Sequence, residues 1–175
     1  MDMFDMIMHR RSVRQYTDEA VPDELLKKIL YAGLAAASSK NRRPWEFIVV
    51  RDKDMLYKLS DCRPGAGNLL LNCDTAIVIA ADSELVDVWV EDCASAMTQM
   101  HLMADALGVG SCWLQVRLRK APDGIQDTET VVRNLLGIPN QYGVMAILTL
   151  GMPATHPGAR TLDDLLLEKI HHEHF

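Results

Sequence analysis

The chain has 175 residues, of which 49% are hydrophobic and 24% charged, a composition typical of one globular domain with a continuous core. Its 18 Lys and Arg residues against 24 Asp and Glu residues give a net charge of −6, which argues against nucleic acid and anionic membranes as partners. No apolar run reaches the roughly 18 residues of a membrane span, and acidic residues precede the first basic one, unlike a secretory signal. We therefore expect a single cytoplasmic domain over residues 1–175 with reduced cysteines.

A short helix is expected at the N-terminus, and the next helix begins within residues 21–24. Pro22 stands at its first helical position, and Asp23 and Glu24 lie in its first turn, where proline and acidic side chains are favoured. Apolar residues then recur on one face of the helix, and the pattern ends in the small residues of 33–39.

Four short apolar segments bounded by polar or turn residues are predicted strands: 45–50, 76–80, 112–116 and 144–150. Three further helices are predicted at 52–59, 127–136 and 161–170. Because strands and helices do not alternate strictly, we expect an α+β domain or a mixed sheet rather than a doubly wound fold.

The segment 88–107 is predicted to be a long helix. From Cys93 to Leu107 its only formally charged residue is Asp105, and its apolar side chains occur around the whole circumference. A helix that is apolar on all sides is buried on all sides, which indicates a subunit interface; a central core helix in a monomer is the alternative. We expect Gly108 to end the helix with a left-handed cap.

Arg10, Arg11 and Arg14 gather around Ser12 directly after the short N-terminal helix. Guanidinium groups bind phosphate through paired donors, and a serine adds a hydroxyl. The R-R-S-x-R segment is therefore suited to a phosphomonoester. The alternative is a solvated basic turn that pairs with nearby acids such as Asp18.

A second basic loop, 36–45, joins a predicted helix to a predicted strand. Ser38, Ser39 and Asn41 supply donors and acceptors there, and three cations flank them. Recognition of the edge of a heterocycle needs this combination. The alternative is an ordinary loop between a helix and a strand.

Four motifs follow one another along the chain: R-R-S-V-R-x-Y, then S-x-x-N-x-x-P-W, then A-L-G-V-G-S-C-W, and finally L-G-I-P with L-x-L-G-x-P. In this order, over about residues 6–165, they resemble the FMN-dependent nitroreductase family. The resemblance implies a nitroreductase-like α+β fold, with a mixed or antiparallel central sheet flanked by helices. It also implies an intertwined homodimer, in which the helix 88–107 packs across the two-fold axis and each FMN lies at the interface.

The resemblance further implies which residues bind the FMN phosphate. Arg10 and Ser12 match its principal contacts, Arg11 lies beside them, and Arg160 matches a late phosphate-binding arginine. Arg14 matches a cation near the pyrimidine edge of the isoalloxazine, where positive charge stabilises an anionic reduced flavin.

Two other segments match positions around the flavin ring. The first reaches the flavin of the other subunit and comprises Ala37, Ser38, Ser39 and Asn41. The second is the strand that donates a backbone N–H to flavin N5, and it comprises Trp113, Leu114 and Gln115.

The sequence departs from the family pattern at four positions. Ala37 replaces a proline of many members, Arg43 a glutamine, Val116 a glycine and Gly158 a lysine of some relatives. We expect Arg43 and Val116 to make the substrate side of the pocket narrower and more basic. Because Gly158 stands in place of that lysine, we expect Arg160 to be the one cation of its loop that binds the phosphate.

The resemblance implies a ping-pong oxidoreductase in which the flavin takes hydride from NADH or NADPH and then reduces a second substrate. Nitroaromatics, quinones and flavins are the small oxidants implied. The choice between NADH and NADPH stays open, although four arginines could serve a 2′-phosphate if they border the cleft: Arg42, Arg43, Arg117 and Arg119. The alternative is a non-catalytic FMN-binding sensor or carrier.

The histidines His171, His172 and His174 are a candidate transition-metal site. Solvated histidines that favour a helix dipole are the alternative, and we expect no physiological metal there. Cys93 is expected to pack within its apolar helix rather than react, because burial in apolar surroundings disfavours the thiolate.

Overall fold

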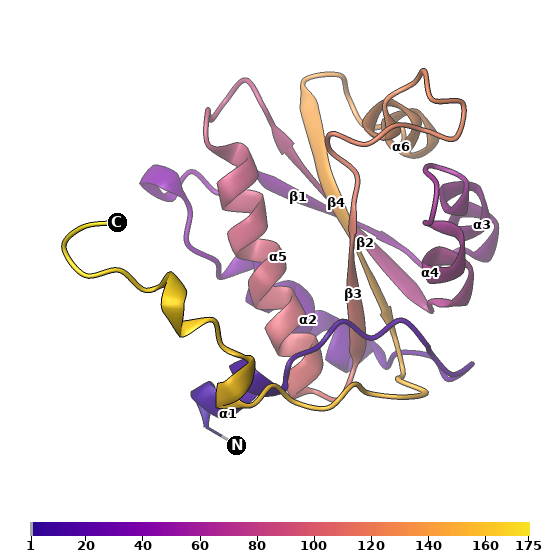
Figure 1. Cartoon of the computed structure of the whole chain (residues 1–175). Coiled ribbons are helices and arrows are strands. Elements are labelled where there is room, and N and C mark those ends of the chain that lie inside the picture. The colour runs from indigo at the N-terminus through magenta and orange to yellow at the C-terminus, as the bar shows by residue number, and fades with distance from the viewer. Residues whose placement is uncertain (1) are drawn as a thin grey trace.

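The computed structural model describes residues 2–175 and contains a four-stranded sheet (Figure 1). The strands lie in the order β1-β2-β4-β3, with bounds β1 Trp45–Val50, β2 Thr75–Asp82, β3 Gly110–Gln115 and β4 Tyr142–Gly151. Each neighbouring pair is antiparallel, so the sheet is antiparallel throughout and the expected α+β class is confirmed. β1 and β3 form the two edges of the sheet.

Side-chain alternation along the central strands divides the core into two layers. Successive residues of a strand point to opposite faces: Ile77 and Ile79 of β2 belong to one buried cluster, and Val78 and Ala80 to the other. Because β2 is buried over nearly its whole length, both faces of the sheet need a cover of helices.

The helices supply this cover on both sides (Figure 1). α2 (Asp23–Leu34) and α5 (Trp89–Ala106) pack on one face. The other face carries three shorter helices, α3 Lys53–Ser60, α4 Gly67–Asn72 and α6 Thr128–Leu136. α1 (Met3–His9) lies against α5 at the edge of the molecule.

Close packing of α2 on α5 depends on Gly33. A Cβ at this position would lie 2.8 Å from both Cγ and Sδ of Met100 on α5. Such a distance is shorter than van der Waals contact, so a larger residue would push the two helices apart.

The long helix α5 is only partly buried by its own chain. Met97, Met100 and Ala104 are fully buried against the sheet and α2. Leu102 and Met103 are half-buried, and Ala106 is exposed. Together with Met3 and Met6 of α1 they line an apolar groove of about 420 Å³. The sequence makes α5 apolar around its whole circumference, but one chain buries only part of that surface. Gly108 ends the helix at φ 73°, as expected.

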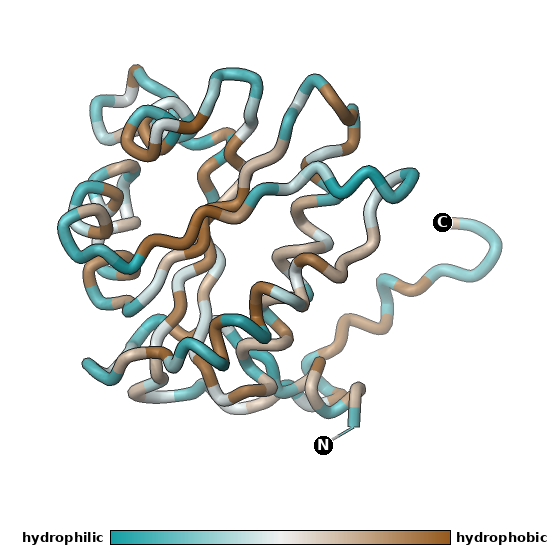
Figure 2. The backbone as a smooth tube through the Cα atoms, turned by 180° about the vertical axis from the view of Figure 1, so that it is seen from behind, coloured by the Kyte–Doolittle hydropathy of each residue, from teal (hydrophilic) through white to brown (hydrophobic). Residues whose placement is uncertain are grey.

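The helix predicted at 161–170 is wrong. The structure has two short 3₁₀ turns there, Leu162–Asp164 and Leu167–Lys169, on an arm that leaves the body of the molecule (Figures 1 and 2). Its apolar side chains, among them Leu162, Leu167 and Ile170, are exposed. An isolated helix of this length gains too little from its own hydrogen bonds, and packing supplies most helical stability.

Two smaller differences concern helix starts. Pro22 is the N-cap of α2 rather than its first helical residue, and the prediction omitted α4. The remaining strands and helices lie within a few residues of their predicted positions.

Across residues 2–175, none of the helices is both long and apolar enough to cross a membrane.

Candidate functional site

The basic segment 10–14 is fixed along the edge strand β3. The Val13 N–H donates to the Ser111 carbonyl at 2.9 Å, and the Val13 side chain is buried. Gly110 makes room for it, since a Cβ there would lie 2.8 Å from Cγ1 of Val13. Tyr16 then donates to the Val13 carbonyl at 2.9 Å. The segment 10–14 is therefore held in a defined conformation by hydrogen bonds and packing against β3.

Four arginines meet around one cavity beside this edge. The cavity has a volume of about 220 Å³ and is lined by Arg10, Arg11, Ser12, Arg14, Pro157 and Arg160. The Arg160 N–H donates to the Met8 carbonyl at 2.9 Å, and Arg11 donates to the Gly158 carbonyl. These bonds bring a distant loop onto the N-terminal segment, so the structure places the four predicted phosphate-side residues together with Arg14.

Arg10 is held by a histidine that the sequence analysis missed. Its Nη1 donates to Nε2 of His101 on α5 at 2.8 Å, so Nε2 accepts and the ring proton lies on Nδ1, which bonds Ser111 Oγ. Burial, together with the nearby Arg10 charge, lowers the pKa of His101 to about 4. The imidazole is thus neutral at pH 7. A histidine four residues before Asp105 within an apolar helix was the available signal.

The arginines of the cavity repel one another electrostatically. Burial first, and then the charge of Arg160, lower the pKa of Arg10. An arginine remains charged even so. Clustered positive charges that the described chain leaves unneutralised favour an anionic ligand, because such a ligand relieves their mutual repulsion.

Cys112 lies beneath this cavity and remains a thiol. Burial raises its pKa, and the opposing effects of Arg14 and Arg10 are smaller. Burial likewise raises the pKa of Cys93 to about 12. Neither thiol has the thiolate character that a nucleophile requires.

The open edge of β3 presents backbone donors next to the cavity. The carbonyls of Ser111 and Gln115 turn away from β4, to the Val13 N–H and to Arg63 Nη1 at 2.8 Å. In an antiparallel pair the N–H and C=O of one residue face the same side and alternate along the strand. The N–H groups of Trp113 and Gln115 therefore face the open edge, whereas that of Leu114 faces β4.

Side chains hold the end of β3 in place. Trp113 Nε1 donates to Gln115 Oε1 at 2.9 Å, and Gln115 Nε2 donates to the Arg117 carbonyl at 3.0 Å. Val116 follows with a fully buried side chain in the core. The expectation that Val116 narrows the pocket is therefore wrong, because its side chain points into the interior.

The loop 38–43 is held in an unusual backbone conformation. Lys40, Asn41 and Arg43 have φ values of 51°, 55° and 48°, in the left-handed region that costs about 1–2 kcal/mol for most residues. The Ser39 N–H donates to Asp92 Oδ1 at 2.8 Å, and the Arg43 N–H donates to Ser38 Oγ at 3.0 Å. These bonds stabilise one strained shape on the surface.

This loop does not meet the cationic cavity within one chain. It is attached at Asp92, in the first turn of α5, whereas Arg10 is attached at His101, nine residues further along the helix. At 1.5 Å per residue the two anchors are about 13 Å apart along the axis. The structure thus separates Ser38, Ser39 and Asn41, with the adjoining exposed Ala37, from the arginines.

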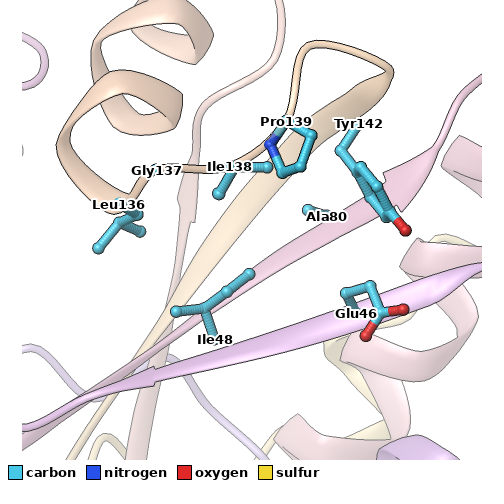
Figure 3. Close-up of a pocket in the computed structure, with 8 residues that line it drawn as sticks. All are labelled: Glu46, Ile48, Ala80, Leu136, Gly137, Ile138, Pro139 and Tyr142. Carbon is cyan, nitrogen blue, oxygen red and sulfur yellow. The ribbon is translucent and has the colours of Figure 1, made fainter.

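An apolar pocket at the opposite edge of the sheet belongs to neither group (Figure 3). It has a volume of about 260 Å³ between β1 and the loop that follows α6. Glu46 and Ile48 of β1 line one side, and Pro139 and Tyr142 the other. Ala80 of β2 also lines it, on the face of the sheet that carries α3, α4 and α6.

Comparison with known proteins agrees with this architecture. The model of the nitroreductase family matches residues 7–62 and 63–152. A putative NADH dehydrogenase/NAD(P)H nitroreductase of Archaeoglobus fulgidus is 40% identical over 173 residues, which cover 96% of this chain and 95% of that protein.

Two solved structures extend the comparison. An FMN-dependent nitroreductase of Clostridium difficile R20291 has a TM-score of 0.95 and 44% identity, with 99% of this chain and 100% of that chain covered. A putative nitroreductase of Desulfovibrio desulfuricans, in complex with FMN, has a TM-score of 0.75 and 30% identity, with 96% of each chain covered. The chain belongs to the nitroreductase family.

Proposed function

We propose that this chain is an FMN-dependent oxidoreductase that transfers reducing equivalents from NADH or NADPH to a small oxidant. The names of its relatives, an NAD(P)H nitroreductase and an FMN-dependent nitroreductase among them, support this class of reaction. The observation that carries the proposal is the cavity that four arginines and Ser12 form beside the open edge of β3.

The cavity fits the phosphate of FMN in charge and in donors. Arg10, Arg11 and Arg160 offer guanidinium donors, and Ser12 offers a hydroxyl. At about 4 Å and an effective dielectric of about 20, each charge pair contributes about 4 kcal/mol before the cost of desolvation. His101 holds Arg10 in place while it stays neutral, so it supplies an acceptor without adding a competing charge.

The edge of β3 is suited to the flavin ring. The Gln115 N–H faces outward there, and the Trp113 ring fixes the Gln115 side chain by a hydrogen bond. Arg14 stands at the rim of the same cavity. We assign the Gln115 N–H as the donor to N5 and Arg14 as the cation near the pyrimidine edge. Bound FMN would supply a two-electron carrier, and the protein orients it and stabilises negative charge.

We further propose a homodimer in which the loop 38–43 completes the site of the other subunit. In one chain this loop is remote from the arginines, and α5 leaves an apolar groove of about 420 Å³ uncovered. A second copy placed on that groove would cover it and would bring Ser39 and Asn41 of one subunit toward the cofactor of the other. The proposed kinetic order is ping-pong, with the oxidized nicotinamide leaving before the oxidant binds.

The proposal is tested by FMN content and by reduction. The purified protein should be yellow and should release one FMN per chain on denaturation. Arg10→Ala should raise the Kd for FMN roughly ten- to hundredfold, because a hydrogen bond to a charged group contributes about 1.5–3 kcal/mol. Lys58→Ala, which removes an exposed charge from α3, is the control and should leave the Kd unchanged.

Anaerobic mixing with each nicotinamide then tests turnover. We expect rapid loss of the flavin absorbance with NADH or NADPH, and its return on addition of a nitroaromatic or a quinone. A flavoprotein whose absorbance is stable under both nicotinamides is a carrier rather than an enzyme. A protein that takes up no FMN contradicts the whole proposal.

A further inference from the structure

Two histidines share one buried carboxylate behind the cationic cavity. His9 Nδ1 lies 2.6 Å from Oδ2 of Asp105, and His156 Nε2 lies 2.8 Å from its Oδ1. The two imidazoles are stacked, with ring centroids 4.4 Å apart and an interplanar angle of 18°. One potential ligand atom from each of the three side chains lies within 4.8 Å of the others.

The three residues come from distant parts of the chain. His9 ends α1, Asp105 lies in the last turn of α5, and His156 follows β4. They also line a cavity of about 230 Å³ together with Gly108, Val109, Gly110 and Pro153. Glycines at the wall leave space beside the nitrogen and oxygen atoms. The tertiary structure therefore brings these three side chains together, and the cavity gives solvent access to them.

The charge of the cluster favours a cation. The Asp105 side chain is only 7% exposed, and its ion-pair partners within residues 2–175 are the two histidines. Each carboxylate oxygen of Asp105 faces one imidazole nitrogen, so the cluster offers a hard oxygen and two borderline nitrogens as donors.

We propose that His9, Asp105 and His156 form a binding site for a divalent transition metal of the zinc and cobalt class. Two imidazoles and one carboxylate are ligands that these ions prefer, and three protein ligands leave a position for water. Ligand distances of about 2.0–2.2 Å allow ligand atoms up to about 4 Å apart to share an ion. Small side-chain rotations bring the three residues into this range.

Metal binding here requires only a change of tautomer. The ion takes the place of the protons between the imidazoles and Asp105, and each ring carries its proton on the other nitrogen. His9 and His156 have side-chain exposures of 39% and 26%, so those nitrogens can exchange protons with water. The charge of the ion is then offset in part by the carboxylate.

The ion would clamp the three segments that build the cationic cavity. His9 adjoins Arg10, and His156 lies four residues before Arg160 in the loop bound to Met8. Asp105 lies one helical turn after His101. We therefore expect zinc to raise the melting temperature of the flavin-free protein. This result does not rest on the proposed function.

The test measures binding of Zn²⁺ and Co²⁺ to flavin-free protein that carries no histidine tag. The C-terminal histidines are the obvious competing site, so the experiment is done in a variant in which His171, His172 and His174 are alanine. We expect one equivalent of Zn²⁺ per chain in this variant by equilibrium dialysis, and visible Co²⁺ absorption bands that Zn²⁺ displaces. The melting temperature should rise with added Zn²⁺.

Within that background, His156→Ala is the test variant. Its affinity for Zn²⁺ should fall by about tenfold or more, with loss of the Co²⁺ bands and of the thermal shift. The far-UV circular dichroism of His156→Ala and its uptake of FMN report independently that it folds. Asp105→Asn, which keeps the side-chain size, should lose the metal in the same way.

Two outcomes overturn the inference. The first is Zn²⁺ binding by the triple alanine variant that His156→Ala leaves unchanged. The second is failure of the triple alanine variant to bind Zn²⁺ or Co²⁺, in which case the three residues are a hydrogen-bonded group only. Both are distinguishable from failure of the proposed function, because FMN content is measured separately on the same preparations.

Discussion

The two ends of α5 carry two parts of the candidate site that differ in how they are built. At the C-terminal end, His101 joins Arg10, and segments far apart in the sequence enclose a cavity within one chain. At the N-terminal end, Asp92 holds the loop 38–43 in a strained conformation at the surface. The first part is complete in the monomer. The second, the loop 38–43, is held in one conformation but lies apart from the arginines within one chain.

The two parts differ in how closely cofactor binding depends on the stability of the fold. The cationic cavity is supported by packing residues, since Val13, Gly110 and His101 fix the N-terminal segment to β3 and α5. Changes there should therefore affect the fold and cofactor binding together. Changes in the loop should affect cofactor binding with little effect on the fold.

The largest expected effect concerns pH and His101. Its pKa is about 4 in the folded protein against 6.5 as the ordinary value. The unfolded chain therefore binds a proton that the folded chain does not between these values, and stability falls as pH falls from 6.5 to 4. At 1.36 kcal/mol per pKa unit the loss amounts to about 3 kcal/mol.

The His101→Gln variant keeps an acceptor for Arg10 but does not titrate. Urea unfolding of both proteins at pH 7, 5.5 and 4.5 measures the difference. We expect the free energy of unfolding of the variant to fall less steeply with decreasing pH. Parallel pH profiles would show that His101 is not the titrating group.

A second prediction tests whether the cavity depends on close packing. Gly110→Ala should place a Cβ 2.8 Å from Val13 Cγ1 and 3.1 Å from the Gly151 carbonyl oxygen. Overpacking of this kind costs about 1–3 kcal/mol, and displacement of the basic segment should weaken FMN binding as well. Gly158→Ala, which meets open space, is the control. Equal stability of the two variants would contradict the packing role of Gly110.

The smallest expected effect is in the loop. Lys40→Gly should relieve a positive φ that costs about 1–2 kcal/mol, while the greater freedom of glycine in the unfolded chain offsets about 0.5–1 kcal/mol. The net gain in the free energy of unfolding should be at most about 1.5 kcal/mol, measured by denaturant titration. A loss of more than 1 kcal/mol would mean that the Lys40 side chain has a structural role.

Local patterns in the sequence were sufficient for most of the fold. Pro44 and Asp52 bound β1, and Gly108 ends α5 in a left-handed conformation as expected. The failures have tertiary causes. In the segment predicted as the C-terminal helix, Leu162, Leu166, Leu167 and Ile170 are exposed, so little packing stabilises a helix there.

The candidate site divides in the same way. The arginines around Ser12 could be predicted because they are adjacent in sequence. His9, Asp105 and His156 could not, since 96 and 51 residues separate the partners of their two hydrogen bonds. The role of His101 likewise depends on Arg10, 91 residues away. Only the tertiary structure brings such pairs together.

The central claim is that each site combines the arginine cavity of one subunit with the loop 38–43 of another. Mixed dimers of Arg10→Ala and Ser39→Ala/Asn41→Ala subunits, isolated through two different affinity tags, test it directly by FMN titration. If the loop acts across the interface, one site of each mixed dimer carries both defects and the other carries none. We therefore predict one FMN bound per mixed dimer with wild-type Kd, although both parent dimers bind weakly. Two weak sites and no wild-type site would contradict the account.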